Sequence, residues 1–176
     1  MRRLRYNVAM SLDGYIADAQ GAFDWILHDD TVDLAGLFAK VDTIILGRRT
    51  YDVVRAHGSP PWKPGTRVFV VSRTLAPESR DGVTIVSGDP VAIASSLRRE
   101  AGEGEIWLFG GGLLFAELLA GRQVDAVEVT IVPILLGGGV PMLAPTSGAT
   151  PLKLTHSHVY PSGMVAVHYG VPGASA

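Results

Sequence analysis

The sequence contains no cysteine. Disulfide bonds, thiolate metal sites and a cysteine nucleophile are therefore excluded, and a reducing compartment is the simpler expectation. Neither sign of charge is in excess, because 15 lysine and arginine residues stand against 17 aspartate and glutamate residues, for a net charge of −2. This balance predicts no general attraction to nucleic acid or to an anionic membrane, so any anion must bind at a local site.

Long apolar runs are also missing. No stretch approaches the roughly 18 to 20 apolar residues that a membrane-spanning helix needs. The basic start, MRRLRYNVAMSLDG, is interrupted by Asn7, Ser11 and Asp13 before its apolar part reaches the length of a signal peptide. We therefore expect a cytoplasmic protein without a membrane partner.

The size and composition of the chain are those of one globular domain. Its 176 residues are 47% apolar and 18% charged, which supplies enough apolar material for a core and differs from the composition of disordered chains. We expect a single domain over residues 1–176.

Apolar segments of strand length alternate with segments of helical spacing. Helices are expected at Thr31–Val41, Thr50–Arg55, Asp89–Glu100, which begins with an Asp-Pro pair, and Gly112–Ala120, which ends before a glycine. Strands are expected at Leu4–Met10, Thr43–Leu46, Arg67–Val71, Val83–Val86, Glu105–Phe109 and Asp125–Val132. This alternation predicts an α/β fold with a mainly parallel sheet.

The C-terminal part of the chain follows another pattern. Leu152–Tyr160 and Met164–Val171 have the composition of strands, and Pro161-Ser162-Gly163 between them is typical of a turn. We expect an antiparallel hairpin at the edge of the sheet.

Three expected strands end in residues that suit a phosphate. Phe109-Gly110-Gly111-Gly112 lets backbone N–H groups approach an anion at the start of a helix, although a tight strand-to-helix turn explains the glycines equally well. Leu46-Gly47-Arg48-Arg49-Thr50 and the pair Ser72 and Arg73 offer guanidinium and hydroxyl donors, with a solvated basic turn as the alternative. Because ligands of open α/β sheets bind at the carboxyl ends of strands, the convergence of three such ends favours a phosphate site.

Other candidate groups give weaker signals. The loop Ser11–Trp25 is either a lid or a connector, and Asp29, Asp30 and Asp33 precede a helix, where capping is the favoured interpretation for at least two of them. The five histidines lack metal-ligand spacing, so no metal site is expected. No Gly-x-Ser-x-Gly elbow occurs, and the tryptophans, among them Trp107, are most simply core or pocket-wall residues.

Five segments carry a resemblance to a known family. SLDGYIA, LGRRTYD, VVSR, FGGGLLFAELL and VDAVEVTIVPILLGGG occur in this order. Their order and spacing resemble the dihydrofolate-reductase-like superfamily over about residues 4–170. SLDG and PILLGGGVPML are most similar to the C-terminal reductase domain of the bacterial riboflavin biosynthesis deaminase-reductase and its stand-alone relatives. The implied fold is a three-layer α/β sandwich with a mainly parallel central sheet and an antiparallel C-terminal hairpin.

The resemblance implies NADPH as the cofactor, with NADH the lesser choice. It gives the pyrophosphate turn to the start of the helix after Phe109, with a cis bond at Gly110–Gly111. It implies that the Gly47–Thr50 turn and the strand end at Ser72 and Arg73 bind the cofactor's phosphates. It also implies that the first strand, at Ala9, and the lid contact the nicotinamide. The implied cofactor residues are Ala9, Ile16, Ala17, Gly47, Arg48, Arg49, Thr50, Ser72, Arg73, Gly110, Gly111, Gly112 and Leu113.

On the substrate side, the resemblance implies Asp30 as the acid, with Asp29 and Asp33 as competitors, and Thr130 as the accompanying hydroxyl. Thr66 stands where a folate reductase has an arginine, and Arg67 is one residue away, on the other face of a strand. The deaminase motifs His-x-Glu and Cys-x-x-Cys are absent, which excludes that activity.

The implied activity is NADPH-dependent reduction of 5-amino-6-(5-phosphoribosylamino)uracil. The alternatives are reduction of dihydrofolate or another small heterocycle, and a nucleotide-binding module without turnover. The glycine run Gly137–Gly139 suits either close approach of a phosphorylated sugar or a plain turn. The apolar C-terminal strands, together with the resemblance, predict a homodimer across the edge of the sheet.

Overall fold

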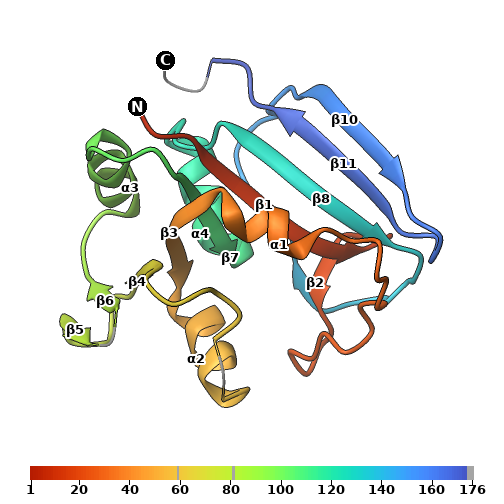
Figure 1. The fold of residues 1–176 in the computed structure, drawn as a ribbon, viewed down its shortest axis with the longest axis horizontal. Helices are drawn as coiled ribbons and strands as arrows, with labels where there is room; N and C mark the ends of the chain where they lie inside the picture. The colour runs from red at the N-terminus through yellow and green to blue at the C-terminus, as the bar shows by residue number, and fades with distance from the viewer. Residues whose placement is uncertain (59, 81, 174–176) are drawn as a thin grey trace.

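Nine strands form one twisted sheet in the residues that the computed structural model describes, which are 1–58, 60–80 and 82–173 (Figure 1). Their spatial order is β10-β11-β8-β1-β7-β3-β4-β6-β5. The strands are β1 (Leu4–Ser11), β3 (Val41–Gly47), β4 (Arg67–Val71), β5 (Glu78–Arg80), β6 (Val83–Val86), β7 (Glu105–Gly110), β8 (Ala126–Val132), β10 (Lys153–Val159) and β11 (Val165–Gly170). Strands β2 (Tyr15–Ala17) and β9 (Val140–Pro141) pair separately.

The central part of the sheet is parallel and both edges are antiparallel. Strands β8, β1, β7, β3, β4 and β6 run parallel to one another. At one edge β5 pairs antiparallel with β6, and at the other the hairpin of β10 and β11 pairs antiparallel with β8. The α/β class, the mainly parallel sheet and the C-terminal hairpin are thus confirmed.

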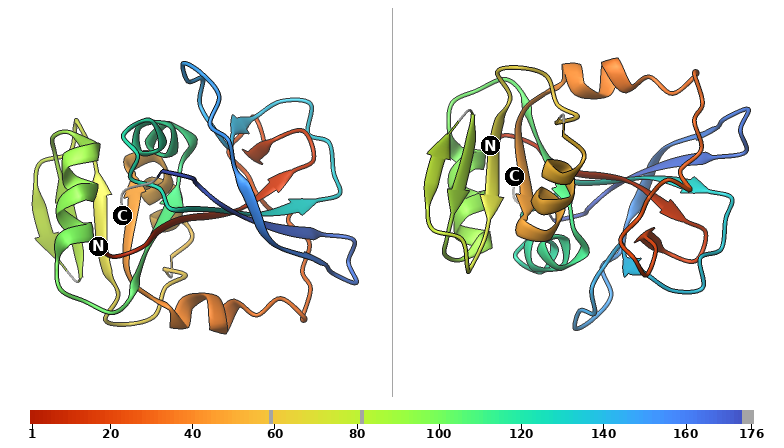
Figure 2. Two further views of the ribbon diagram at one scale, coloured as in Figure 1. Left: turned by 90° about the horizontal axis from the view of Figure 1, so that it is seen from above. Right: turned by 90° about the horizontal axis from the view of Figure 1, so that it is seen from below.

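Four helices flank the sheet in the described part of the chain, namely α1 (Leu34–Ala39), α2 (Arg48–Ala56), α3 (Pro90–Arg99) and α4 (Gly112–Ala120). Figure 2 shows α1 and α4 on opposite faces of the sheet, which gives the three expected layers. Asp89 caps α3 by accepting a hydrogen bond from the Val91 N–H, and α4 ends at Gly121. Both helices therefore have the predicted ends.

The helix predicted at Thr31–Val41 is shorter than expected. The Asp33 carboxylate accepts a hydrogen bond from the Gly36 N–H at 2.7 Å, so α1 begins only after Asp33. At the other end, Val41 is the first residue of β3. Helix α2, in contrast, begins two residues before the predicted Thr50, because Gly47 is its N-cap residue.

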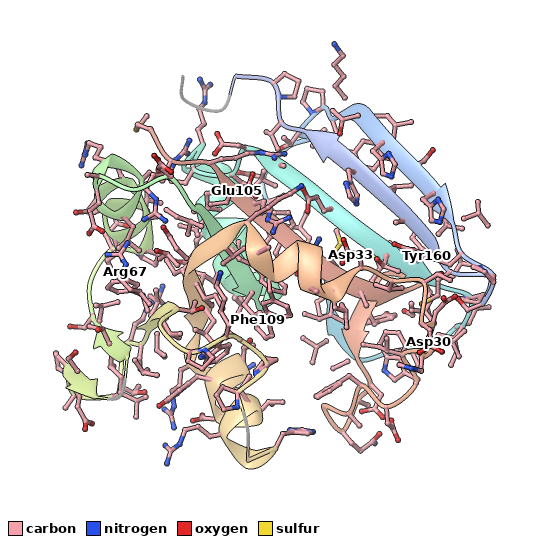
Figure 3. All side chains as sticks on the ribbon, in the orientation of Figure 1. Asp30, Asp33, Arg67, Glu105, Phe109 and Tyr160 are labelled. Carbon is pink, nitrogen blue, oxygen red and sulfur yellow. The ribbon has the colours of Figure 1, made fainter. Side chains whose placement is uncertain are left out.

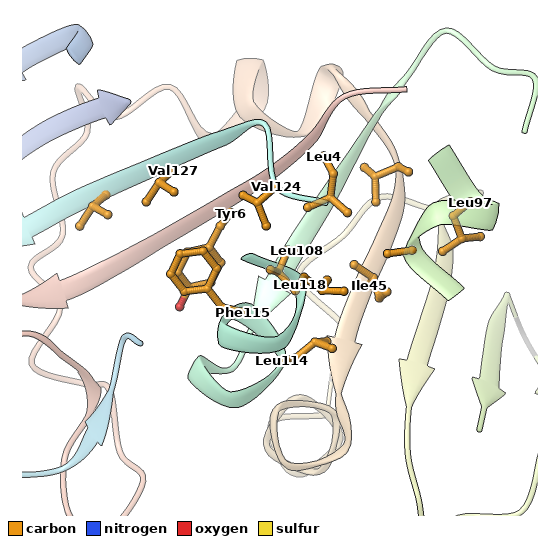
Figure 4. Close-up of a cluster of buried hydrophobic side chains, with 13 residues drawn as sticks. Leu4, Tyr6, Ile45, Leu97, Leu108, Leu114, Phe115, Leu118, Val124 and Val127 are labelled. Atoms are coloured by element: carbon orange, nitrogen blue, oxygen red, sulfur yellow. The ribbon is translucent and has the colours of Figure 1, made fainter. Parts of the chain in front are cut away.

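The two faces of the sheet differ in polarity. Leu4 and Tyr6 of β1 join side chains of α3 and α4 in a buried apolar cluster (Figure 4). Because side chains alternate along a strand, Arg5, Asn7 and Ala9 point to the face covered by α1. That face carries charged and hydroxyl groups beside a second apolar cluster, and it forms the floor of a large cleft.

Candidate functional site

A cleft of about 1880 Å³ lies along the carboxyl ends of the strands and beneath α1. All the site residues that the sequence predicts line this cleft. They are Ala9, Ile16, Ala17, Asp30, Gly47, Arg48, Arg49, Thr50, Ser72, Arg73, Gly110, Gly111, Gly112, Leu113 and Thr130. The individual roles given to these residues stay predictions.

The glycine turn joins β7 to α4. The Gly110–Gly111 bond is cis, as the resemblance implied, and Gly110 has a φ of 144°. Gly111 is the N-cap residue of α4, and no described side chain caps the N–H groups there. A Cβ atom on Gly112 would overlap the carbonyl oxygen of Pro141, so this glycine also lets α4 approach β9.

Arginines surround the start of α2. Gly47 is the N-cap residue, and among the described residues no side chain caps this helix either. Arg48 pairs with Asp52 at 3.3 Å and donates to the Thr74 hydroxyl, while Arg73 pairs with Glu117 of α4 at 2.9 Å. These contacts hold two of the guanidinium groups that line the cleft against side chains of α2 and α4.

Ser72 has a structural role in addition to its place on the cleft. It is buried, and its hydroxyl oxygen accepts hydrogen bonds from the backbone N–H groups of Thr74 and Leu75 at 3.2 and 3.0 Å. These two bonds shape the turn that carries Arg73.

The lid predicted at Ser11–Trp25 is attached to the glycine run after β8. The Asp13 carboxylate accepts hydrogen bonds from the Ser11 hydroxyl and from the backbone N–H groups of Leu136 and Gly137. These bonds, the one from Ser11 first, lower the pKa of Asp13. Strand β2 of the lid then pairs with β9. The segments SLDG and LLGGG are therefore joined in space.

The glycine run Gly137–Gly139 serves this attachment. A Cβ atom on Gly139, which has a φ of 145°, would overlap the carbonyl oxygen of Ala17. Close approach of the lid backbone therefore explains this glycine.

The three acidic residues before α1 have different surroundings. The Asp30 side chain is 94% exposed and pairs with His28 at 2.9 Å. Asp29 accepts a hydrogen bond from the Ser162 N–H at 3.0 Å and two more from Thr31, and the bonds from Ser162 and Thr31 hold its pKa well below the usual range. Asp33 caps α1. Only Asp33 therefore has the capping role that the sequence favoured for at least two of the three, and Asp29 instead anchors the loop to Ser162.

A buried charged network beneath α1 was not predicted. Arg5 and Glu128 are 4% and 5% exposed, and Arg5 donates to Glu128 Oε2 at 3.1 Å and to the carbonyl oxygen of Leu37 in α1 at 2.8 Å. Asn7 donates to the same Oε2 at 2.9 Å, and Glu105 Oε2 lies 2.9 Å from Arg5 Nε. These four residues line the cleft. The only sequence feature that could have indicated this network is the presence of charged residues within otherwise apolar strands.

Two further features border this network. His168 of β11 lies beside Glu128 in the register, and burial lowers the pKa of its imidazole. On the other side, Phe38 of α1 packs against Trp107 with ring centroids 5.0 Å apart, and Trp107 packs against Phe109 at 4.9 Å. One part of the floor is thus polar and the other aromatic.

A family model for the RibD C-terminal domain matches residues 2–166. The chain belongs to this family. The RibD C-terminal domain family is a reductase family, which agrees with a cleft lined by helix starts and arginines.

Two relatives are similar to the chain over nearly its whole length. A protein from Shewanella sp. PV-4, provisionally assigned to riboflavin biosynthesis, has 31% identity and a TM-score of 0.84 over 97% of this chain and 99% of its own. YwjB from Bacillus subtilis (strain 168) is 29% identical over 173 residues, which cover 96% of this chain and 97% of YwjB.

More distant structures share the fold. The deaminase/5-amino-6-(5-phosphoribosylamino)uracil reductase of Thermotoga maritima has 17% identity and a TM-score of 0.71, covering 97% of this chain and 57% of its own. Dihydrofolate reductase from Enterococcus faecalis, in a complex with NADP(H), has 18% identity and a TM-score of 0.69, covering 97% of this chain and 96% of its own. The fold is therefore dihydrofolate-reductase-like.

Two other findings concern the described residues. None of their helices has the length and apolar character to cross a membrane. Within the same residues, no three or more histidine, aspartate or glutamate side chains gather in a way that would hold a metal ion.

Proposed function

We propose that this protein is an NADPH-dependent reductase of the riboflavin-biosynthesis type, which reduces a C=N or C=O bond in a small heterocyclic or sugar-linked substrate. The observation that carries the proposal is that one cleft brings together three groups of residues. They are the three strand ends that suit a phosphate, the predicted lid, and the floor formed by β1 and β8. NADPH bound there would supply the hydride. The protein itself would bind and orient the cofactor and the substrate, and would exclude water from the reacting groups.

The groups on the cleft suit the phosphates of NADPH. The N-terminal N–H groups of α2 and α4 have no side-chain cap among the described residues. Arg48 and Arg73 are held nearby by Asp52 and Glu117, and Arg49 is exposed on the cleft without a hydrogen bond or ion pair to any described residue. Free N–H groups at a helix start and guanidinium groups are strong partners for a pyrophosphate and a 2′-phosphate.

The remaining predicted residues divide between nicotinamide and substrate. Ala9 of β1 pairs in register with Thr130 of β8, so the backbone assigned to the nicotinamide and the hydroxyl assigned to the substrate are neighbours. Ile16 and Ala17 lie on β2, which pairs with β9. We assign them to exclusion of water above the reacting bond, and we assign Thr130 and Asp30 to the substrate.

Among the described residues, no arginine stands at the position that the resemblance aligns with the glutamate-tail arginine of folate reductases, because that position is Thr66. Thr66 is buried, and Arg67 pairs with Glu100 at 2.7 Å and donates to Thr43 at 2.9 Å. Neither residue lines the cleft, and Arg67 lies on the opposite side of the molecule from Asp30 (Figure 3). This favours 5-amino-6-(5-phosphoribosylamino)uracil over dihydrofolate as the substrate.

The test is NADPH oxidation with each substrate in turn, followed by absorbance. We expect a higher kcat/KM for the phosphoribosylamino-pyrimidine, because the missing charge-assisted bond to folate is worth about ten- to a hundredfold in binding. A higher value for dihydrofolate would defeat this substrate assignment. NADPH binding without turnover of either substrate would favour another heterocycle or a nucleotide-binding module that performs no reaction.

A further inference from the structure

Glu128 is a buried carboxylate on the floor of the cleft, and one of its two oxygens accepts no hydrogen bond from any described residue. Its Oε2 accepts hydrogen bonds from Arg5 and Asn7. Its Oε1 accepts none from any described residue, and Arg3 NH2, on an exposed side chain, lies 3.8 Å away. A carboxylate that is 5% exposed and lines a cleft has one acceptor available to a ligand.

The distance along the sheet between Glu128 and the residues assigned to the nicotinamide matches the length of one substrate ring. Glu128 pairs in register with Asn7, and Thr130 pairs with Ala9, so the two pairs form successive rows on the same face of the sheet. Two residues along a strand span about 7 Å. A six-membered heterocycle with its substituents bridges such a distance.

Aromatic side chains border the same part of the floor. Trp107 and Phe109 of β7 and Phe38 of α1 line the cleft, and Trp107 packs against both of the others. The Trp107 indole N–H donates to the carbonyl oxygen of Asn7 at 3.0 Å, which fixes its ring beside β1. A planar ring that lies here contacts aromatic faces on one side and the Glu128 carboxylate at its edge.

We propose that Glu128, held in place by Arg5 and Asn7, is the specificity-determining acceptor of the substrate pocket and selects planar heterocycles that present a ring N–H at the edge away from the reduced bond. The proposal rests on the proposed reductase function and names its substrate class. It adds a carboxylate on the floor of the sheet to Asp30, the acid assigned to the substrate in the loop before α1. The Asp30 carboxylate is 94% exposed, where solvent screens its interactions, whereas Glu128 acts in a sheltered place.

The experiment compares two ligands that differ only in their ring N–H groups, 5,6-diaminouracil and 5,6-diamino-1,3-dimethyluracil. Their dissociation constants are measured by calorimetric titration of the full chain in the presence of NADPH. For the wild-type protein we expect 5,6-diaminouracil to bind about tenfold more tightly or better, since a hydrogen bond to a carboxylate is about twice as strong as one between neutral groups.

The variant Glu128→Gln keeps the shape and removes the charge. We expect it to lose most of the preference, leaving about threefold or less. The matched control is Glu105→Gln, which removes a carboxylate from the same Arg5 network, and it should keep the wild-type preference. Glu128→Asp keeps the charge, so it should retain a preference larger than that of Glu128→Gln.

Three results would overturn the proposal: a wild-type protein that binds neither probe or does not discriminate between them, an unchanged preference in Glu128→Gln, or an equal loss in Glu105→Gln. Because these are equilibrium measurements with probes, they do not depend on turnover. Failure of the proposed function would instead appear as absent NADPH binding, or as absent NADPH oxidation while the N–H preference persists.

Discussion

Arg48 and Arg73 are the residues whose removal most directly tests the choice of cofactor. Both line the cleft, and both are held by a carboxylate, Asp52 or Glu117. A charge-assisted bond to phosphate is worth about 1.5–3 kcal/mol when sheltered and less at an exposed position such as that of Arg73. We expect NADPH to bind more tightly than NADH, and the double variant Arg48→Ala/Arg73→Ala to reduce this preference at least about tenfold.

Fluorescence titration with the two nucleotides measures this preference. Arg55→Ala is the matched control, because Arg55 belongs to the same helix, α2, but does not line the cleft. Equal dissociation constants for NADPH and NADH, or a preference that survives the double substitution, would contradict the assignment.

Single residues differ in how well the sequence predicts their place. The glycines and arginines of the strand ends could be placed on one cleft, because parallel strands bring their carboxyl ends to the same edge. Glu128 could not, because a charged residue inside a strand gives no local signal of the partner that Arg5 of β1 supplies. The exposure of Asp30 could not be predicted either, because it depends on the path of the loop before α1.

At the scale of elements, the lid depends on a close contact between backbones. Gly139 has a φ of 145° and meets the Ala17 carbonyl, whereas Gly138 has free space around the position of a Cβ atom. Gly139→Ala should therefore displace β2, with a strain of about 1–3 kcal/mol, and weaken both thermal stability and NADPH binding. Gly138→Ala should leave both near the wild-type values. Similar melting temperatures and dissociation constants for the two variants would count against this account of the lid.

The loop before α1 is attached to the C-terminal hairpin through Asp29. Its carboxylate accepts a hydrogen bond from the Ser162 N–H in the turn between β10 and β11. Asp29→Ala should speed hydrogen exchange of the Ser162 amide, while Asp30→Ala, which removes a neighbouring exposed carboxylate, should not. Unchanged exchange at Ser162 in Asp29→Ala would show that this bond does not hold the turn.

The same bond predicts a pH dependence. Hydrogen bonds lower the pKa of Asp29, so on acidification the unfolded chain takes up this proton before the folded protein does. The contribution of Asp29 to stability is therefore full above its ordinary pKa of 3.8 and is lost as the pH falls further. The difference in melting temperature between wild type and Asp29→Ala should shrink below that pH, and a constant difference would argue against the linkage.

Elements were predictable where their ends carry local signals. Helices α3 and α4 begin and end as expected because a capping aspartate and a terminal glycine mark them. The pattern over Thr31–Val41 was misleading, because apolar residues that belong to β3 continued the helical spacing of α1. Strands β2, β5 and β9, of two or three residues, are too short for any periodicity and exist through their pairing partners.

At the scale of the whole molecule, the order of the strands leaves β10 at one edge of the sheet. The sequence predicted the hairpin but not that β11, rather than β10, would pair with β8. All seven residues of β10 are exposed, and apolar Leu154 and Val159 are 53% and 69% exposed. Proteins rarely leave such an edge uncovered, because its free N–H and C=O groups would pair with other chains.

We propose that two copies of this chain pair through β10 and form a homodimer. The wild-type protein should sediment at micromolar concentration with twice the monomer mass of 18.6 kDa. A substitution in a two-fold interface acts twice, so Val159→Lys should shift the protein towards the monomer by repulsion and desolvation of two added charges. Leu135→Lys is the matched control, since Leu135 is also 69% exposed but lies in the segment after β8. A monomeric wild type, or equal dissociation of the two lysine variants, would exclude the β10 edge as the interface.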